Sequence, residues 1–139
     1  MKQIRIKTDA SHRPGSGFGI GYVANMFRVN SIKNQITGGK YCTFNCSSTD
    51  AERFAVVWSL NDVISRLDIH KREYEIILNT DCENVIRKFN DESCEDEGMK
   101  ILRHYKRLFK SFQIHWIPRA ENRKADAIAR SNLDKGMEK

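Results

Sequence analysis

The chain has 139 residues, of which 40% are hydrophobic and 30% charged, a composition typical of a folded globular domain and not of a disordered segment. No apolar run approaches the roughly eighteen residues of a membrane span, and the N-terminal residues lack the apolar stretch of a signal peptide. We expect a cytoplasmic protein, a monomer without a membrane partner, and the net charge of +6 favours a polyanionic partner.

Three strands are predicted in the first third of the chain. Apolar and polar residues alternate over residues 4–9, which predicts a strand that ends on a carboxylate ahead of a glycine-rich turn. Residues 18–24 predict a second strand, and a third lies within residues 29–45, interrupted by Gly38 and Gly39. Strands that follow one another as a meander pair antiparallel.

Helices alternate with two further strands in the rest of the chain. An apolar run over residues 74–79 is typical of a buried parallel strand. The predicted elements are, in order, a helix that begins with a capping box at Thr49 and Glu52 and ends near His70, the strand over 74–79, a short helix over 83–89, an acidic linker over 90–97, a long amphipathic helix, a strand over 113–117, and a final helix capped by Asn122.

This order predicts an α/β fold. A meander followed by βαβ crossovers gives a mixed sheet with helices on both faces. Right-handed crossovers place the fourth and fifth strands beside the first, so the five-stranded sheet has the order 3-2-1-4-5 and the first strand lies at its centre. We expect one domain over residues 1–133 and a frayed tail over residues 134–139.

Four carboxylates lie at junctions between these elements. Each has an ordinary structural explanation: Asp9 as a turn residue, Glu52 as part of the capping box, Asp81 as a helix cap, and Asp126 as a complement to a helix N-terminus. These explanations do not account for the convergence of all four at one end of one sheet. Crowded carboxylates repel one another, and oxygen ligands without clustered His or Cys favour Mg²⁺ or Mn²⁺. Two such ions, about 3.5–4 Å apart, can activate water and stabilise the leaving oxygen of a phosphodiester.

The segments around these acids resemble the type 1 ribonuclease H family, in an order and spacing that match over about residues 3–131. The most specific motif is R-x-x-N-x-x-A-D. The matching segments are Thr8-Asp9-Ala10-Ser11, Ala51-Glu52-Arg53-Phe54-Ala55, Asn79-Thr80-Asp81-Cys82 and Pro118-Arg119-Ala120-Glu121-Asn122-Arg123-Lys124-Ala125-Asp126.

The resemblance implies a ribonuclease H-like fold that hydrolyses the RNA strand of an RNA–DNA hybrid. It further implies that Asp9, Glu52, Asp81 and Asp126 hold two Mg²⁺ ions, with Mn²⁺ as a substitute, and that the products end in 3′-hydroxyl and 5′-phosphate groups. Contacts to the hybrid are expected from residues near these acids: Ala10, Ser11, Ser47, Ser48, Thr49 and Asn122.

The chain departs from the family pattern in four places. Ala10 stands where the family has Gly, and Ser48-Thr49 stands where it has an Asn pair. Many members carry a His in the loop before the last acid; Arg119 occupies that loop here and can either assist release of the product phosphate or have a plain surface role. The family's basic protrusion is absent, because residues 81–97 carry a net charge of −5.

Basic residues also recur along the long amphipathic helix. They form either a phosphate-binding stripe or a solvated face, and we take Arg103 and Arg107 as candidate hybrid contacts. The stripe consists of Lys100, Arg103, Lys106, Arg107 and Lys110.

Two functions remain open from the sequence. The first is a metal-dependent endoribonuclease acting on RNA–DNA hybrids. The alternative is a non-catalytic or weakly catalytic module that binds hybrid or RNA, which the departures at Ala10, Ser48 and Thr49 keep open. A proofreading exonuclease is disfavoured, because the first strand lacks the D-x-E that such enzymes usually need.

Overall fold

The computed structural model describes residues 2–28, 31–68 and 70–138. In chain order the elements are β1 (Lys2–Arg13), β2 (Gly17–Arg28), β3 (Ser31–Cys42), α1 (Ser48–Leu67), a 3₁₀ turn (Lys71–Glu73), β4 (Tyr74–Thr80), α2 (Glu83–Asn90), α3 (Glu97–Leu108), β5 (Ser111–Trp116), a second 3₁₀ turn (Arg119–Glu121) and α4 (Arg123–Met137). None of the helices in the described residues is long and apolar enough to cross a membrane.

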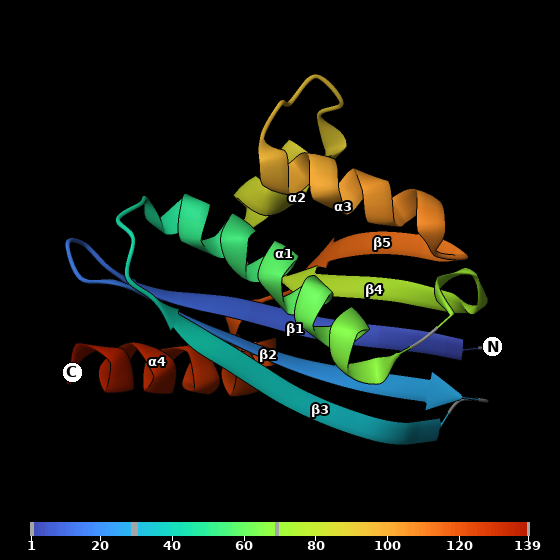
Figure 1. The fold of residues 1–139 in the computed structure, drawn as a ribbon, viewed down its shortest axis with the longest axis horizontal. Coiled ribbons are helices and arrows are strands. Elements are labelled where there is room, and N and C mark those ends of the chain that lie inside the picture. The colour runs from blue at the N-terminus through green and yellow to red at the C-terminus, as the bar shows by residue number, and fades with distance from the viewer. Residues whose placement is uncertain (1, 29–30, 69, 139) are drawn as a thin grey trace.

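The strands form one sheet in the order β3-β2-β1-β4-β5, which confirms the predicted order 3-2-1-4-5. β1 pairs antiparallel with β2 and parallel with β4, and β4 pairs parallel with β5. Helices α1, α2 and α3 cover one face of the sheet and α4 covers the other (Figure 1). β1 is therefore the central strand, with partners on both sides.

β1 is longer than the sequence predicts. It pairs with β2 as far as Arg13, whereas its pairing with β4 ends at Lys7. Asp9 is therefore a strand residue and not a turn residue, and it lies where β1 continues past the end of its parallel partner. The predicted glycine-rich turn is confirmed, and Gly15 and Gly17 adopt positive φ angles of 78° and 92° there.

β3 runs without interruption through Gly38 and Gly39. A Cβ atom at Gly39 would lie 2.1 Å from the Ile20 carbonyl oxygen, and one at Gly38 would lie 2.7 Å from the Tyr22 ring. The two glycines therefore allow close packing within a continuous strand and do not break it. Residues 29–30, at the start of the range predicted for this strand, lie outside the described residues.

Both ends of α1 and the end of α4 differ from prediction. The N-cap of α1 is Ser47, whose hydroxyl accepts the Asp50 N–H at 3.1 Å, so the predicted capping box at Thr49 is wrong. The helix ends at Leu67, followed by Asp68 in the left-handed conformation with φ 45°. α4 continues to Met137, so residues 134–137 are helical where the sequence predicts a frayed tail.

The main core lies between the sheet and helices α1, α2 and α3. It is built from alternate residues of the central strands and the inward faces of the helices, including Ile4, Ile6, Val56, Leu60, Val63, Ile76, Leu78, Met99 and Leu102. Burying such side chains contributes roughly 1.5–3 kcal/mol each. The core therefore fixes β1, β4 and α1 relative to one another, which matters because each of them leads to one of the predicted acids.

On the other face, α4 approaches β2 at two glycines. A Cβ atom at Gly19 would lie 2.1 Å from the Ala129 carbonyl oxygen, and one at Gly21 would lie 2.4 Å from the Ala125 carbonyl oxygen. Gly21 is also the partner of Asp9 in the β1–β2 register. The absence of a side chain at Gly21 therefore lets the first turn of α4, which carries Asp126, pack beside Asp9.

We predict that Gly21→Ala destabilises the protein by about 1–3 kcal/mol, the typical cost of overpacking, because the new methyl group meets the α4 backbone. Gly98→Ala is the matched control: its Cβ would meet only side chains, those of Asp96 and Val57, at 3.1 Å. Its effect should stay within about 1 kcal/mol, the range of helix propensity. The free energy of unfolding from denaturant titration measures both, and a Gly21→Ala variant as stable as the parent would show that α4 does not sit directly on β2.

Candidate metal centre

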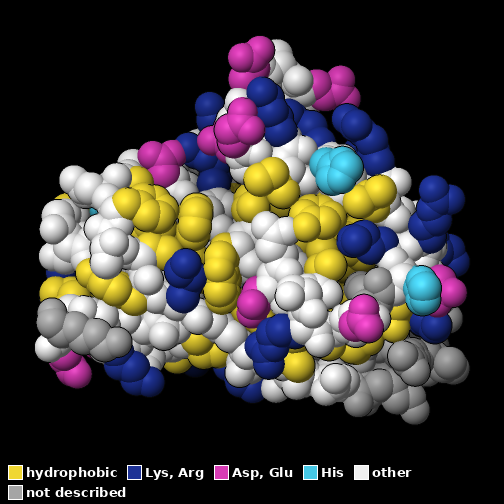
Figure 2. Space-filling view, viewed as in Figure 1, with side chains coloured by type: hydrophobic (Ala, Val, Ile, Leu, Met, Phe, Trp, Pro, Cys, Tyr) yellow, Lys and Arg dark blue, Asp and Glu magenta, His cyan; other side chains and the backbone are white. Residues whose placement is uncertain are grey.

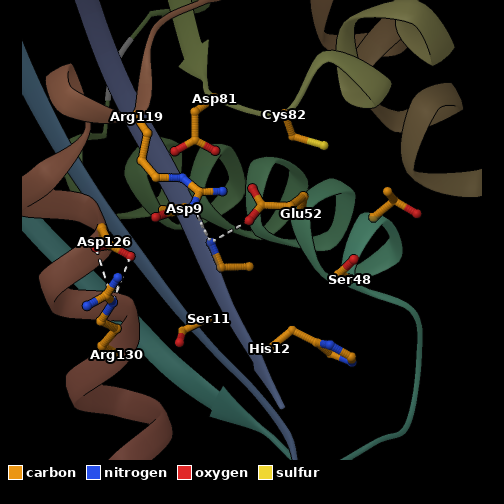
Figure 3. A pocket seen from close by; sticks show the side chains of 12 residues that line it. Asp9, Ser11, His12, Ser48, Glu52, Asp81, Cys82, Arg119, Asp126 and Arg130 are labelled. Atoms are coloured by element: carbon orange, nitrogen blue, oxygen red, sulfur yellow. Dashed lines mark hydrogen bonds and ion pairs between the residues drawn. The ribbon is translucent and has the colours of Figure 1, made fainter. Parts of the chain in front are cut away.

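Three carboxylates converge in a cavity of about 410 Å³ at the end of β4 (Figure 3). Asp9 comes from the middle of β1, Glu52 from the first turns of α1, and Asp81 directly follows β4. One oxygen atom from each of them lies within 4.8 Å of the others. The fold therefore brings together three of the four acids that the sequence singles out.

A single backbone amide holds two of these carboxylates. The Ala10 N–H lies 2.9 Å from Asp9 Oδ1 and 3.1 Å from Glu52 Oε1, and both oxygens accept it. Glu52 therefore reaches across to β1 and does not serve the start of its own helix. The other oxygen of Glu52, Oε2, is buried and has no hydrogen-bond partner.

Burial and mutual repulsion disfavour the charged forms of these acids. Burial, followed by the charge of Asp81, raises the pKa of Asp9 from 3.8 to about 7. Burial, followed by the charge of Asp9, raises the pKa of Glu52 from 4.5 to about 10. A cation in the cavity would compensate all three charges.

The donor set fits a hard divalent cation. Mg²⁺ and Mn²⁺ prefer carboxylate oxygens, and the unpartnered Oε2 of Glu52 is a buried acceptor that lacks a donor. No His or Cys belongs to this group of three acids. Asp9, Glu52 and Asp81 would hold such an ion, and the raised pKa values of Asp9 and Glu52 mean that binding would release protons.

Asp126 lines the same cavity but is not one of the three clustered acids. It lies on α4, and its two carboxylate oxygens are each 3.2 Å from Nε of Arg130, one helical turn later. Hydrogen bonding to Asp126 contributes to the raised pKa of Asp9. The fourth predicted acid therefore reaches the site, paired with a cation of its own helix.

Asn122 is fully buried, and its contact with nucleic acid stays a prediction. Its side-chain amide donates to the Thr8 carbonyl oxygen at 2.8 Å and to Asp81 Oδ2 at 3.2 Å. Although Asn122 occupies the N-cap position of α4, its side chain makes no capping hydrogen bond. It instead joins β1, the start of α4 and the Asp81 carboxylate.

Two more side chains support the site without having been predicted. The Trp116 indole N–H donates to the Asp81 carbonyl oxygen at 3.2 Å, which fixes the backbone after β4. His12 Nε2 lies 2.6 Å from the Cys46 carbonyl oxygen, which ties the β1–β2 hairpin to the segment before α1. His12 lies three residues after Asp9, close to the end of the predicted strand. This spacing was the sequence signal that could have identified it as a residue near the site.

The remaining predicted contacts divide between the cavity and other places. Ala10, Ser11, Ser48, Thr49 and Arg119 line the cavity, together with the unpredicted His12, Cys82 and Arg130 (Figure 3). Ser47 is absent from the lining and serves as the N-cap of α1. The Arg119 side chain reaches into the cavity from the 3₁₀ turn after β5.

Arg103 does not face solvent as a free phosphate ligand. Its guanidinium donates to four backbone carbonyl oxygens, those of Lys88, Phe89, Asp91 and Cys94. It therefore holds the α2–α3 loop, and its assignment as a hybrid contact stays a prediction. Arg107 and Lys106 are exposed, and they line a surface hollow together with Arg103 and Glu92. Acidic side chains gather at the top of Figure 2, where the α2–α3 loop lies in the same view.

We predict that the stability of the metal-free protein falls as the pH rises. Because the folded-state pKa values of Asp9 and Glu52 lie above the ordinary values of 3.8 and 4.5, the folded protein binds more protons than the unfolded chain. Their contribution is complete below about pH 4 and is lost as the pH rises through about 7 for Asp9 and toward about 10 for Glu52.

Thermal melting in the presence of a chelator, from about pH 5 to about pH 9, measures this loss. Glu52→Gln removes one of the two groups, so Tm of that variant should fall less steeply. Superimposable pH profiles for parent and variant would contradict the crowded-acid description of the cavity.

Comparisons with known proteins agree with this architecture. A sequence profile of the reverse transcriptase-like family matches residues 29–132. No curated protein sequence matches the chain. Among solved structures, the RNase H1 of the halophilic archaeon Halobacterium salinarum NRC-1 is 21% identical, with a TM-score of 0.74 over 96% of this chain and 98% of that one.

A second similar structure is LC11-RNase H1, isolated from compost by a metagenomic approach. It is 22% identical, with a TM-score of 0.73 over 99% of both chains. The same protein in complex with an RNA/DNA hybrid gives a TM-score of 0.72 at 20% identity, over 96% of this chain and 99% of that one. The match to more than half of the chain shows that the protein belongs to the reverse transcriptase-like family, with a ribonuclease H-like fold.

Proposed function

We propose that the protein is a metal-dependent endoribonuclease that hydrolyses the RNA strand of RNA–DNA hybrids and leaves 5′-phosphate and 3′-hydroxyl ends. The observation that carries the proposal is the cluster of Asp9, Glu52 and Asp81 in one open cavity, with Asp126 on its wall. The fold agrees with that of RNase H1 proteins, one of which was crystallised with an RNA/DNA hybrid. That likeness supports the choice of substrate.

The proposed cofactor is a pair of Mg²⁺ ions, with Mn²⁺ as a substitute. Asp9, Glu52 and Asp81 would hold the first ion, and Asp126 would complete the site for the second. Bound divalent ions supply a water nucleophile at neutral pH and a positive charge beside the leaving oxygen. The proposed mechanism therefore requires enough carboxylates to hold two ions, and it requires no protein nucleophile.

The protein's own groups orient these ligands. The Ala10 N–H fixes one oxygen each of Asp9 and Glu52, and the Asn122 amide fixes one oxygen of Asp81. The second oxygen of Glu52, Oε2, has no hydrogen-bond partner and would stay available to an ion. Supporting groups of this kind typically change metal affinity or activity by about 10–100-fold when removed.

Substrate contacts are proposed for the polar wall of the cavity. The hydroxyl groups of Ser11, Ser48 and Thr49 can hydrogen-bond a ribose 2′-hydroxyl or a phosphate oxygen, and the 2′-hydroxyl is the group by which a protein distinguishes RNA from DNA. Arg119, which is exposed and lines the cavity, can pair with the 5′-phosphate of the product. These assignments leave Ser47 in its structural role.

The second candidate is a module that binds hybrid without efficient cleavage. It is favoured by Ala10, which places a methyl group in the cavity wall where the resembling family has Gly. Against it, Ala10 also packs on the small apolar cluster around Phe18 and Ala55. That packing keeps its side chain compatible with an open cavity.

Cleavage of a hybrid labelled on its RNA strand tests the proposal. We expect cleavage with Mg²⁺ or Mn²⁺, none with chelator, and a loss of more than about 100-fold in Glu52→Gln, beyond the range for a residue that only supports a metal ligand. Neutral Gln retains an oxygen for the Ala10 N–H, so the fold should be kept and Tm in chelator should be unchanged or raised. Glu95→Gln, an exposed acid in the α2–α3 loop, is the matched control.

The outcomes separate the two candidates. Tight hybrid binding without cleavage in either metal would favour the binding module. Cleavage by the Glu52→Gln variant at the parental rate, or cleavage that resists chelator in pure protein, would overturn the proposed metal centre.

Binding of the hybrid should rest on exposed basic residues of α3. We predict that Lys106→Ala and Arg107→Ala each weaken hybrid binding and make the slope of log K against log salt shallower by about 1, as expected for the loss of one phosphate contact. Arg72→Ala, at the opposite end of the sheet from the cavity, should change neither quantity. Arg103→Ala should instead lower Tm, because it removes the hydrogen bonds that hold the α2–α3 loop.

Fluorescence anisotropy with a labelled hybrid, measured over a series of salt concentrations in chelator, gives both quantities. Unchanged affinity and slope in the Lys106 and Arg107 variants would show that this part of α3 is only a solvated face.

A further inference from the structure

We propose that Arg130 is a competing counter-ion for the fourth acid, so that the cavity binds its two divalent ions with unequal affinity and the weaker ion must displace Arg130 from Asp126. The inference rests on the metal centre proposed above. It concerns a residue that neither the sequence motifs nor the three clustered acids include.

The geometry of the pair carries the first step. Nε of Arg130 lies 3.2 Å from both carboxylate oxygens of Asp126, so one cationic group covers both possible ligand atoms (Figure 3). Both residues line the cavity. A divalent ion at these two oxygens would compete with the guanidinium for their lone pairs and be repelled by its charge.

The three other acids differ from Asp126 in their ion-pair partners. Asp9, Glu52 and Asp81 lie together within 4.8 Å without Asp126, and no described basic side chain is paired with any of them. An ion can enter among them without breaking an ion pair. A second ion that uses Asp126 must first separate it from Arg130, which makes that ion the weaker of the two.

Exposure identifies Arg130 as the partner that moves. Its side chain is 67% exposed, whereas that of Asp126 is 24% exposed, so water can accept the released guanidinium. Exposed ion pairs four residues apart on a helix are weak. The competition should therefore lower the affinity for the second ion by only about two- to fivefold, an effect large enough to measure and small enough to be reversed by millimolar metal.

Calorimetric titration of the nucleic-acid-free protein with Mn²⁺ tests the inference without any cleavage assay. The parent should bind a first ion tightly and a second ion weakly. Arg130→Gln should strengthen the second by about two- to fivefold and leave the first within about twofold. Arg130→Lys, which keeps a cation on α4, should lie between the parent and Arg130→Gln.

Arg119→Gln is the matched control for charge, because it removes a second guanidinium from the same cavity wall without touching Asp126. It should not selectively strengthen the second ion. An equal gain in affinity for the second ion in Arg119→Gln and Arg130→Gln would overturn the inference. The gain would then come from the removal of any positive charge near the cavity and not from the Asp126–Arg130 pair. Parental affinities in Arg130→Gln would also overturn the inference.

The titration distinguishes a failure of this inference from a failure of the proposed function. If the parent binds one ion that depends on Glu52, and Arg130→Gln adds no second ion, the metal centre stands and the inference about Arg130 falls. A parent that binds no Mn²⁺ overturns both. A second ion that becomes detectable only in Arg130→Gln supports the inference.

Discussion

Repulsion among crowded, partly buried carboxylates is the constraint on which the rest of this structure depends. Asp9 is buried, and Glu52 keeps one oxygen out of solvent and without a partner. Burial of unpaired acids is unfavourable, and here it raises their pKa values far above the ordinary range. The main core overcomes this repulsion by fixing β1, β4 and α1 together. The carboxylates then remain crowded in the folded protein, and a bound cation would relieve their repulsion.

The fourth acid reaches the site by a different route, through the opposite face of the sheet. Gly21 pairs with Asp9 and lets α4 lie directly on β2, so Asp126 arrives from a helix that shares none of the main core. Asn122, at the start of that helix, bonds to both β1 and Asp81. One buried amide therefore connects the two faces, and the position of α4 is coupled to the orientation of a carboxylate from β4.

Much of this arrangement follows from the sequence, because the ends of parallel strands meet at one edge of a sheet. That rule, with hydrophobic periodicity and right-handed crossovers, predicted the strand order and the convergence of Asp9, Glu52, Asp81 and Asp126, of which the first three cluster. These rules could not choose between chemically similar neighbours, because Ser47 and Thr49 are both good helix caps. The roles of Asn122 and Arg130 depend on how closely α4 packs, which helical periodicity does not report.

The central claim is that the crowded acids form a centre for divalent cations. Anomalous scattering from a crystal grown with Mn²⁺ tests it most directly. We predict a strong peak among Asp9, Glu52 and Asp81, at about 2 Å from their oxygens, and a weaker second peak toward Asp126 at about 3.5–4 Å from the first. Peaks only at other surface acids, with the three carboxylates left uncoordinated, would contradict the account.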